Sequence, residues 1–265
     1  MPRTASHPDP AAADAPPAWA APDLDRPHAQ PDKARRVEQM FAAIAPSYDL
    51  NNRVHSLGRD QAWRRAAVRA ADIQPGDRVL DVACGTGDLS LAFQDTAAAH
   101  VVGIDFTVPM LAVANQKDPG PERPTYYAGD ALRLPVADAS VDVVSIAFGI
   151  RNVADPAAAL AEFARVLRPG GRLIVLEFTV PPNPLVRWGN AFYSGWLMPR
   201  TASWIARDRS GAYRYLPRSI NTFASKDQLL RLMADHQFTG VSARSLTLGI
   251  AAIYRGLKPG TGSAP

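Results

Sequence analysis

Residues 79–90 read Val-Leu-Asp-Val-Ala-Cys-Gly-Thr-Gly-Asp-Leu-Ser, and this stretch decides the fold. An apolar run leads into a turn with two glycines, and a helix is predicted after the turn. Gly85 and Gly87 lack a β-carbon, so the backbone there can adopt positive φ and a ligand can lie close to the peptide plane. The stretch therefore predicts a strand, a ligand-binding turn and a helix, which is the layout of a small-molecule cofactor site.

Apolar runs alternate with helical patterns on both sides of this stretch. Strands are predicted at residues 78–83, 101–105, 126–128, 141–148 and 172–178, with a closing strand pair at 241–246 and 250–255. Helices are predicted near residues 33–45, 63–70, 109–116, 155–167 and 226–236. This alternation predicts a doubly wound, Rossmann-like α/β fold with a parallel sheet and a C-terminal antiparallel strand pair. Ligands bind such sheets beyond the carboxyl ends of the strands, where the glycine turn lies.

Composition limits the classes of function. A chain of 265 residues with 47% hydrophobic content fits one α/β domain. The net charge of +4 is a mild basic excess without a dense run of Lys or Arg, so no nucleic-acid partner is expected. Cys84 is the single cysteine, which excludes an internal disulfide and a CxxC zinc site, and no metal is expected. We therefore expect a protein of the reducing cytoplasm.

The chain is predicted to have three parts. Residues 1–32 are rich in Pro and Ala without apolar periodicity, which predicts a disordered tail. Residues 33–258 are predicted to form one domain, and residues 259–265 a flexible C-terminus. The tail lacks the apolar core of a signal peptide, and no apolar run is long enough to cross a bilayer, so any membrane contact is expected to be peripheral, at the inner face.

The residues around the glycine turn distinguish two nucleoside cofactors. A dinucleotide-binding loop carries Gly or Ala three residues after its second glycine, where this chain has Ser90. Asp88 would repel a phosphate, but tolerates a ligand with an ammonium and a sulfonium, such as S-adenosylmethionine. Asp105 ends the second predicted strand, 24 residues after Asp81, close to the spacing of a ribose-binding carboxylate. Asp130, after the third strand, could accept a hydrogen bond from an adenine amino group. The alternatives are that Asp88 complements a helix dipole and that Asp130 is a turn residue.

Several motifs resemble the UbiE/MenG quinone C-methyltransferases. They are Phe-Ala-Ala-Ile-Ala-Pro-Ser-Tyr-Asp at 41–49, Leu-Asp-Val-Ala-Cys-Gly-Thr-Gly-Asp at 80–88 and Phe-Gly-Ile-Arg-Asn-Val at 148–153. Segments 165–173, 176–178 and 213–220 extend the resemblance, which covers residues 33–258. Many methyltransferases share the glycine loop, whereas the pair Arg151-Asn152 beside Tyr48-Asp49 is specific to this family.

The resemblance implies a class I fold and methyl transfer from S-adenosylmethionine to a ring carbon of a polyprenylated quinol. The substrate is demethylmenaquinol, or alternatively 2-methoxy-6-polyprenyl-1,4-benzoquinol in ubiquinone biosynthesis. Relatives of the ubiquinone type carry Ser where this chain has Ala147, which favours demethylmenaquinol. The implied cofactor-binding residues are Thr86, Asp105, Asp130 and Ala131, with Gly85 and Gly87 shaping the loop and Asp81 in the preceding strand.

The reaction needs few catalytic groups, because the sulfonium is already a good methyl donor and the protein must chiefly align it with an electron-rich carbon. Arg151 is the candidate cation that stabilises the developing phenolate, and Asn152 the group that orients the ring oxygen. Tyr48 and His55 are candidates for proton removal. The alternatives are an Arg151 paired with a carboxylate, an Asn152 that starts a turn, a Tyr48 that caps the pocket and a packed His55.

Aromatic and basic residues alternate between Leu185 and Tyr215. The aromatic and apolar members are Trp188, Phe192, Tyr193, Trp196, Leu197, Met198, Trp204 and Ile205, and the basic members are Arg187, Arg200, Arg207 and Arg209. Such a stretch is typical of a membrane interface or an apolar tail groove. A helical lid over the sheet is the alternative, and a homodimer is left open. An NAD-dependent oxidoreductase and a non-catalytic binding module are the competing functions.

Overall fold

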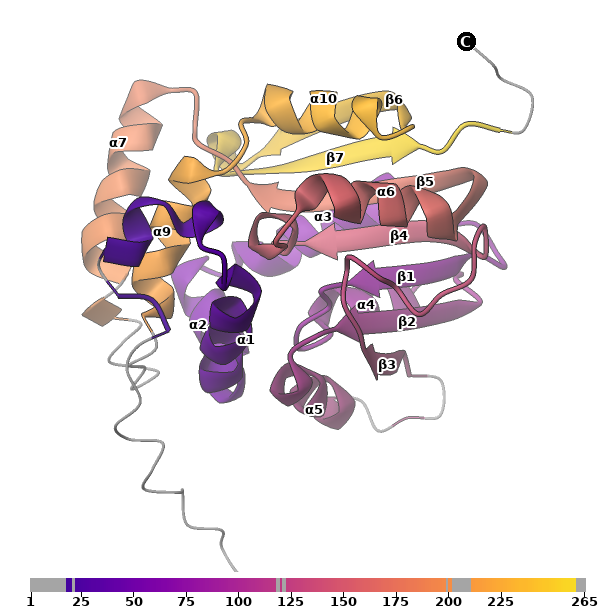
Figure 1. Ribbon diagram of the computed structural model, residues 1–265, viewed down its shortest axis with the longest axis horizontal. Helices are drawn as coiled ribbons and strands as arrows, with labels where there is room; N and C mark the ends of the chain where they lie inside the picture. Colours follow the sequence, from indigo (N-terminus) through magenta and orange to yellow (C-terminus); the bar gives the residue numbers. More distant parts are fainter. Residues whose placement is uncertain are drawn as a thin grey trace, which may run out of the picture.

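The computed structural model describes residues 18–20, 22–117, 120, 123–198, 200–201 and 211–260. Seven strands form one sheet in the order β3-β2-β1-β4-β5-β7-β6 (Figure 1). Their bounds are β1 Arg78–Val82, β2 His100–Asp105, β3 Thr125–Ala128, β4 Val141–Ala147, β5 Leu167–Phe178, β6 Thr239–Leu246 and β7 Ala251–Leu257. The first five strands are parallel, and β7 pairs antiparallel with both β5 and β6. The predicted parallel sheet with an antiparallel C-terminal pair is confirmed.

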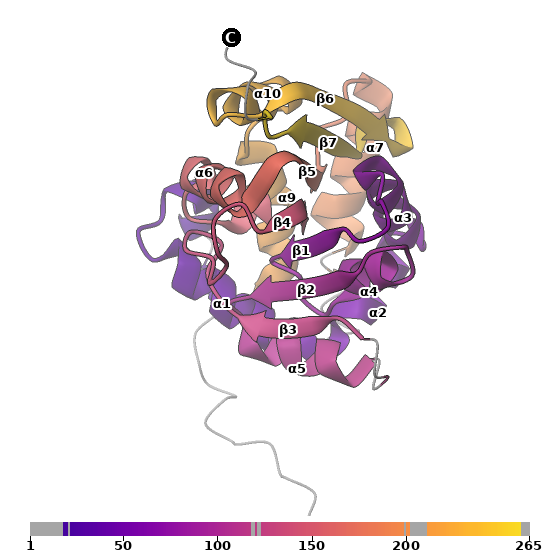
Figure 2. The ribbon, with the colours of Figure 1, turned by 90° about the vertical axis from the view of Figure 1, so that its right-hand side faces the viewer.

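Helices cover both faces of the sheet and its carboxyl end (Figure 2). Their bounds are α1 Lys33–Ile44, α2 Tyr48–His55, α3 Arg59–Ala71, α4 Asp88–Gln94, α5 Val108–Lys117, α6 Pro156–Val166, α7 Pro184–Phe192, α9 Ala212–Thr222 and α10 Lys226–Asp235. A π-helical turn, η6 (Tyr193–Leu197), continues α7, and a short 3-10 turn, η5 (Ile150–Asn152), follows β4. Asp155 begins α6 by accepting hydrogen bonds from the N–H groups of Ala157 and Ala158.

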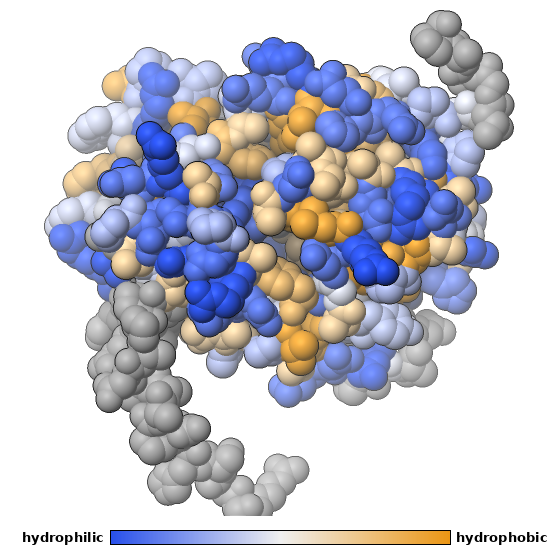
Figure 3. Space-filling view, viewed as in Figure 1, coloured by the Kyte–Doolittle hydropathy of each residue, from blue (hydrophilic) through white to orange (hydrophobic). Residues whose placement is uncertain are grey.

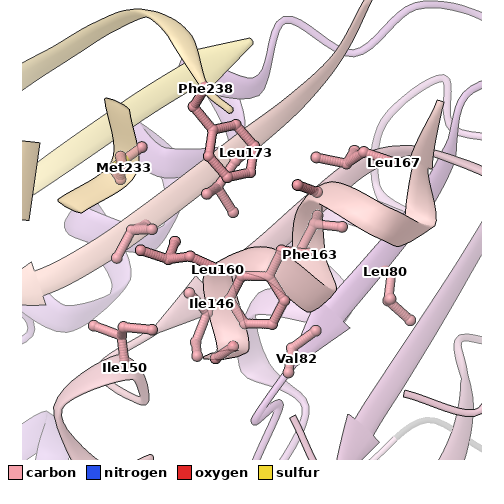
Figure 4. Close-up of a cluster of buried hydrophobic side chains, with 14 of the residues drawn as sticks. Leu80, Val82, Ile146, Ile150, Leu160, Phe163, Leu167, Leu173, Met233 and Phe238 are labelled. Atoms are coloured by element: carbon pink, nitrogen blue, oxygen red, sulfur yellow. The ribbon is translucent and has the colours of Figure 1, made fainter. Parts of the chain in front are cut away.

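The central strands are apolar on both faces because helices cover both. On one face, Leu160 and Phe163 of α6 pack over Val82 and Ile146, and Met233 of α10 extends this core toward β7 (Figure 4). On the other face, α3 and α4 pack on the alternate strand residues; this second core includes Trp63, Ala67, Val79, Phe93, Val143 and Ile174. The period of two along each strand therefore divides its residues between two cores.

A third core, beyond the carboxyl ends of the strands, contains part of the predicted tail. Trp19 is fully buried and stacks on Tyr215 of α9, with ring centroids 4.4 Å apart, and Leu24 is buried beside it. Arg36 of α1 forms an ion pair with Asp23 at 2.8 Å. The prediction of a disordered tail is therefore wrong for the described residues between 18 and 32. Two isolated apolar side chains give no periodicity, and their partners lie far away in sequence. Residues 1–17, 21 and 261–265 lie outside the described part.

Candidate functional site

A pocket lies between the carboxyl ends of the parallel strands and helices α1 and α2. Four kinds of element line it: the apolar side of α1, the start of α2, the turns after β1, β2 and β3, and the segment after β4. The lining residues are Ala34, Val37, Phe41, Tyr48, Ala83, Gly85, Asp105–Thr107, Met110, Gly129–Leu132, Ala147–Gly149 and Asn152–Ala154. In the space-filling view, hydrophobic side chains gather near the centre of the displayed face, beside α1 (Figure 3). This is where a parallel sheet is expected to bind its ligand.

The two glycines of the turn, Gly85 and Gly87, have different structural roles. Both have positive φ, 57° at Gly85 and 80° at Gly87, as predicted. A β-carbon at Gly85 would meet no atom within 4 Å, and Gly85 lines the pocket, so its bare backbone faces open space. A β-carbon at Gly87 would lie 2.3 Å from the Tyr126 hydroxyl oxygen. Gly85 therefore leaves room for a ligand, whereas Gly87 lets α4 pack against β3.

Asp105 joins the glycine turn to the pocket. Its Oδ2 accepts a hydrogen bond from the Gly85 N–H at 2.8 Å, and its Oδ1 accepts one from the Thr107 N–H at 2.8 Å. Burial raises the pKa of the Asp105 carboxyl, and the hydrogen bonds from Thr107 and Gly85 oppose that shift. Asp105 also lines the pocket, so its carboxylate oxygens can accept hydrogen bonds from donors of a bound ligand. This geometry suits a pair of neighbouring hydroxyls, such as those of a ribose.

Asp130 and Ala131 line the neighbouring wall, and their contact with the cofactor stays a prediction. One carboxylate oxygen of Asp130, Oδ1, accepts the Leu132 N–H at 2.9 Å, so the residue is a turn former as well as a pocket residue. Its other oxygen, Oδ2, leaves an acceptor at the pocket edge for a ligand amino group. The two alternatives considered for Asp130 are therefore compatible.

Thr86 and Asp88, by contrast, belong to a polar network behind the turn. The Thr86 hydroxyl donates a 2.6 Å hydrogen bond to Asp49 Oδ1, at the start of α2. Lys117, the last residue of α5, forms ion pairs with Asp49, at 2.7 Å, and with Asp88. The network joins α2, α4 and α5 around the glycine turn. Asp88 thus neutralises a lysine, and Thr86 is oriented toward Asp49; neither is among the residues that line the pocket.

Asp81 is buried beneath the turn and is also absent from the pocket lining. Its carboxylate accepts hydrogen bonds from the hydroxyls of Ser90, at 2.6 Å, and Ser145, at 2.7 Å. Burial raises the pKa of the Asp81 carboxyl to about 6, while the two serine hydroxyls and Arg64 act in the opposite direction. Asp81 therefore joins β1 to α4 and β4. Ser90, which stands where a dinucleotide-binding loop carries Gly or Ala, holds the start of α4 against β1 through this hydrogen bond.

This raised pKa predicts a pH-dependent stability. In the unfolded chain the Asp81 carboxyl is protonated only below about pH 3.9. In the folded protein it stays protonated up to about pH 6. The stabilisation by this proton is complete below pH 4 and is lost as pH rises to about 6. The Asn side chain of the Asp81→Asn variant does not titrate, so this variant does not lose that stabilisation. Its free energy of unfolding relative to that of wild type should therefore increase by about 2 kcal/mol between pH 4 and pH 7.

Urea unfolding at pH 4, 5, 6 and 7 measures this difference. Asp95→Asn is the matched control, because Asp95 is an exposed carboxylate at the end of α4. Its curve should run parallel to that of wild type. A parallel curve for Asp81→Asn would refute the shifted titration of Asp81.

The structure separates the three predicted catalytic residues. Tyr48 of α2 and Asn152 of η5 both line the pocket, whereas Arg151 does not. Asn152 Nδ2 donates to the Phe148 carbonyl at 3.1 Å, and Asn152 Oδ1 accepts the Tyr215 hydroxyl at 3.0 Å. These bonds fix the plane of the Asn152 amide, as a group that orients a substrate requires.

Arg151 lies behind the pocket wall in a buried ion pair. Its guanidinium Nη1 contacts Glu177 Oε1 of β5 at 2.5 Å and donates to the Phe148 carbonyl at 2.8 Å. The side chains of Arg151 and Glu177 are 5% and 1% exposed. The carboxylate pairing that the sequence left as the alternative is therefore present. Arg151 is not among the lining residues, and its contact with a substrate oxygen stays a prediction.

Sequence reasoning missed several residues that shape this site. Val37 and Phe41 of α1 line the pocket, but their helical spacing in the sequence does not distinguish a pocket wall from a core. Lys33 is buried, and its ammonium donates to the carbonyls of Arg151 and Val153 at 2.9 and 2.6 Å. Burial lowers the pKa of Lys33 to about 8, and the charge of Arg151 adds to this shift. Glu177 offered the clearest signal, since an acidic residue inside an apolar strand demands a buried partner.

Two kinds of comparison place this site among known proteins. The chain is 44% identical over 229 residues to a demethylmenaquinone methyltransferase of Deinococcus radiodurans, covering 86% of this chain and 94% of that protein. It is 41% identical over 232 residues to the ubiquinone/menaquinone biosynthesis C-methyltransferase UbiE of Geobacter sulfurreducens, covering 86% and 90%. A solved putative methyltransferase, in complex with the Haloferax volcanii Trm112 methyltransferase activator, has a TM-score of 0.60 at 20% identity, covering 83% and 97%. That likeness shows the shared fold.

The family comparison agrees with the site described above. The match extends over residues 29–258, which include the glycine turn, both pocket carboxylates and the segment with Arg151 and Asn152. The match begins at residue 29, in the packed N-terminal segment that precedes α1. From these findings, the chain belongs to the ubiE/COQ5 methyltransferase family.

Proposed function

We propose that this chain transfers a methyl group from S-adenosylmethionine to a ring carbon of a polyprenylated quinol, with demethylmenaquinol as the substrate. The names of two relatives support this reaction. One is a demethylmenaquinone methyltransferase, and the other is a ubiquinone/menaquinone biosynthesis C-methyltransferase. The observation that carries the proposal is Asp105, a pocket-lining carboxylate that accepts hydrogen bonds from the N–H groups of Gly85 and Thr107. Ala147, which lines the pocket, supports demethylmenaquinol over the benzoquinol, which is the second candidate.

The residues present fit this cofactor. Asp105 offers acceptors for ribose hydroxyls, Asp130 offers one for an adenine amino group, and Gly85 exposes its backbone where a side chain would intrude. The remaining wall is largely apolar, with Val37, Phe41 and Met110 on it. S-adenosylmethionine supplies the electrophilic methyl group when bound. The residues of the chain position it and exclude water, which contributes most of the rate in such reactions.

The two polar pocket residues suit a quinol ring oxygen. The fixed amide of Asn152 has one N–H left over after its bond to the Phe148 carbonyl, and this N–H can donate to the substrate oxygen. Burial raises the pKa of the Tyr48 phenol, while Arg64 lowers it by a smaller amount. The phenol is therefore protonated at neutral pH and acts as a hydrogen-bond donor. This supports an orienting role for Tyr48 and argues against proton removal by its phenolate.

A labelling experiment tests the proposal. The protein is incubated with methyl-labelled S-adenosylmethionine and either demethylmenaquinol or 2-methoxy-6-polyprenyl-1,4-benzoquinol, and incorporation into each quinol is measured. We expect incorporation into demethylmenaquinol at a rate at least about 10-fold above the benzoquinol, the difference of about one polar contact. The reverse preference would assign the ubiquinone pathway. Binding of the cofactor without transfer to either quinol would favour a non-catalytic binding module, and binding of NAD instead would favour an oxidoreductase.

We propose that the reaction takes place at the inner face of the membrane, with the protein in the cytoplasm. In the part of the chain that the structure describes, no helix has the length and apolar character needed to cross a bilayer. A polyprenyl chain partitions into lipid. Peripheral contact is therefore the form of membrane association that this proposal requires.

A further inference from the structure

The surface of α7 and η6 is unusual for a folded protein, because α7 has no buried residue. Four large apolar side chains instead face outward, with exposed fractions of 81% for Leu185, 72% for Trp188, 54% for Phe192 and 50% for Trp196. Their spacing of three or four residues places them on one side of the helix. We call these four residues the aromatic stripe. A contiguous exposed apolar patch of this kind marks an interaction site.

The aromatic stripe is ordered rather than folded back onto the protein. The rings of Trp188 and Phe192 stack at 6.2 Å between centroids with 16° between planes, and those of Phe192 and Trp196 at 5.5 Å with 17°. The guanidinium of Arg200 lies 4.5 Å from the centroid of the Trp196 ring. The rings therefore form a continuous ridge whose end carries a positive charge. A prearranged ridge loses little side-chain entropy when it inserts into an apolar phase.

A second contact ties this ridge to the helix that borders the pocket. The Tyr193 hydroxyl donates to the His55 carbonyl at 3.0 Å, and its oxygen lies 3.2 Å from His55 Nδ1. η6 is thus fixed to the end of α2, which begins at the pocket residue Tyr48. The end of α2 and the turn after it carry exposed apolar residues of their own, Val54 and Leu57. Exposed apolar side chains are therefore present on both of the segments that this contact joins.

The charges around the aromatic stripe decide between two occupants. The sequence has no Asp or Glu between Glu177 and Asp208, whereas Arg187 and Arg200 are exposed. A second copy of the chain, related by twofold symmetry, would bring this basic surface against itself. An anionic bilayer complements it, because its phosphates pair with arginine while its acyl region accepts the rings. Tryptophan beside arginine is the composition found at the boundary between headgroups and acyl chains.

We propose that the aromatic stripe inserts into the headgroup region of an anionic phospholipid bilayer, with Arg187 and Arg200 at the level of the phosphates. The inference rests on the proposed function in one respect, the reason for docking: it brings the enzyme to the phase that contains a polyprenylated quinol. The lipid contact itself follows from the exposed stripe and its charge. The predicted members Trp204, Ile205, Arg207 and Arg209 lie outside the described residues.

Vesicle co-sedimentation without any quinol tests the lipid contact independently of catalysis. Wild type is mixed with vesicles of phosphatidylcholine alone, or with vesicles of phosphatidylcholine that contain roughly 30% phosphatidylglycerol. The second kind has a strongly negative surface. We expect binding to the anionic vesicles that weakens with salt. Trp188→Ser with Trp196→Ser should reduce the partition coefficient at least about 10-fold, and Arg187→Gln with Arg200→Gln should remove the preference for anionic lipid. Tyr127→Ser is the matched control, since Tyr127 is an exposed aromatic of β3 outside the site.

Two further measurements make the outcomes distinct. Calorimetric affinity for S-adenosylmethionine should be unchanged in all these variants, which shows that they fold. Sedimentation velocity shows whether the stripe holds a dimer. Wild type that does not bind vesicles, a double serine variant that binds as wild type does, or a dimer that the serine variant dissolves would overturn the proposal. If the stripe binds lipid and no quinol is methylated, the lipid contact stands and the proposed function falls.

Discussion

Replacement of Asp105 with Asn is expected to weaken the binding of S-adenosylmethionine about 100-fold, from the loss of charged hydrogen bonds. The carboxylate accepts hydrogen bonds from the N–H groups of Gly85 and Thr107, and it lines the pocket. An Asn side chain has one acceptor oxygen, and its NH₂ group would face either a backbone N–H or a ligand hydroxyl. The substitution therefore disturbs the glycine turn and the ribose contact together. Isothermal titration calorimetry with the cofactor measures the effect.

The control for Asp105→Asn is Asp72→Asn. Asp72 is exposed at the end of α3, where φ is 51°, a conformation that Asn adopts readily. This variant should bind the cofactor as wild type does. Thermal unfolding of both variants without cofactor shows whether the pocket is intact. Unchanged affinity in a folded Asp105→Asn variant would remove Asp105 from the cofactor site.

The second large effect concerns the buried ion pair between Arg151 and Glu177. Arg151→Ala leaves the carboxylate unpaired, and Glu177→Gln leaves the guanidinium unpaired. Each change is expected to lower the free energy of unfolding by about 3–5 kcal/mol, because the remaining charge stays buried. Urea unfolding measures both. A loss below about 1 kcal/mol in both variants would mean that the pair is not maintained in solution.

The same two variants separate a catalytic from a positioning role of Arg151. If Arg151 stabilises a phenolate, Arg151→Ala should reduce kcat at least about 10-fold more than Glu177→Gln, with similar affinity for S-adenosylmethionine in both. If Arg151 acts only as the partner of Glu177 in holding the loop with Asn152, the two variants should lose kcat equally. Assays at low temperature keep both variants folded. Equal loss of turnover and of cofactor affinity in Arg151→Ala would take Arg151 out of the chemistry altogether.

The elements of the sheet could be predicted because their signals are local. Each parallel strand is an apolar run of a few residues, and Gly85 announces a turn that other residues rarely form. The order of β1, β2 and β3 along the chain also places Asp105 and Asp130 at neighbouring strand ends, as it did in the prediction. Whether an acidic residue of this motif lines the pocket or supports the turn from behind does not follow from the local sequence. Asp81 precedes the turn in the same motif, but the alternation along β1 directs it toward Ser90 and Ser145.

What the sequence determined by itself is the doubly wound sheet, the glycine turn at its carboxyl end and the acidic residues that follow β2 and β3. Each depends on residues within one strand and one turn. Only the tertiary structure decided that Arg151 pairs with Glu177, that Lys117 joins Asp49 to Asp88 and that Trp19 packs on Tyr215. Partners of this kind are chosen by burial, because an isolated charge or ring must find whatever complement the completed fold brings beside it. No local pattern contains that information.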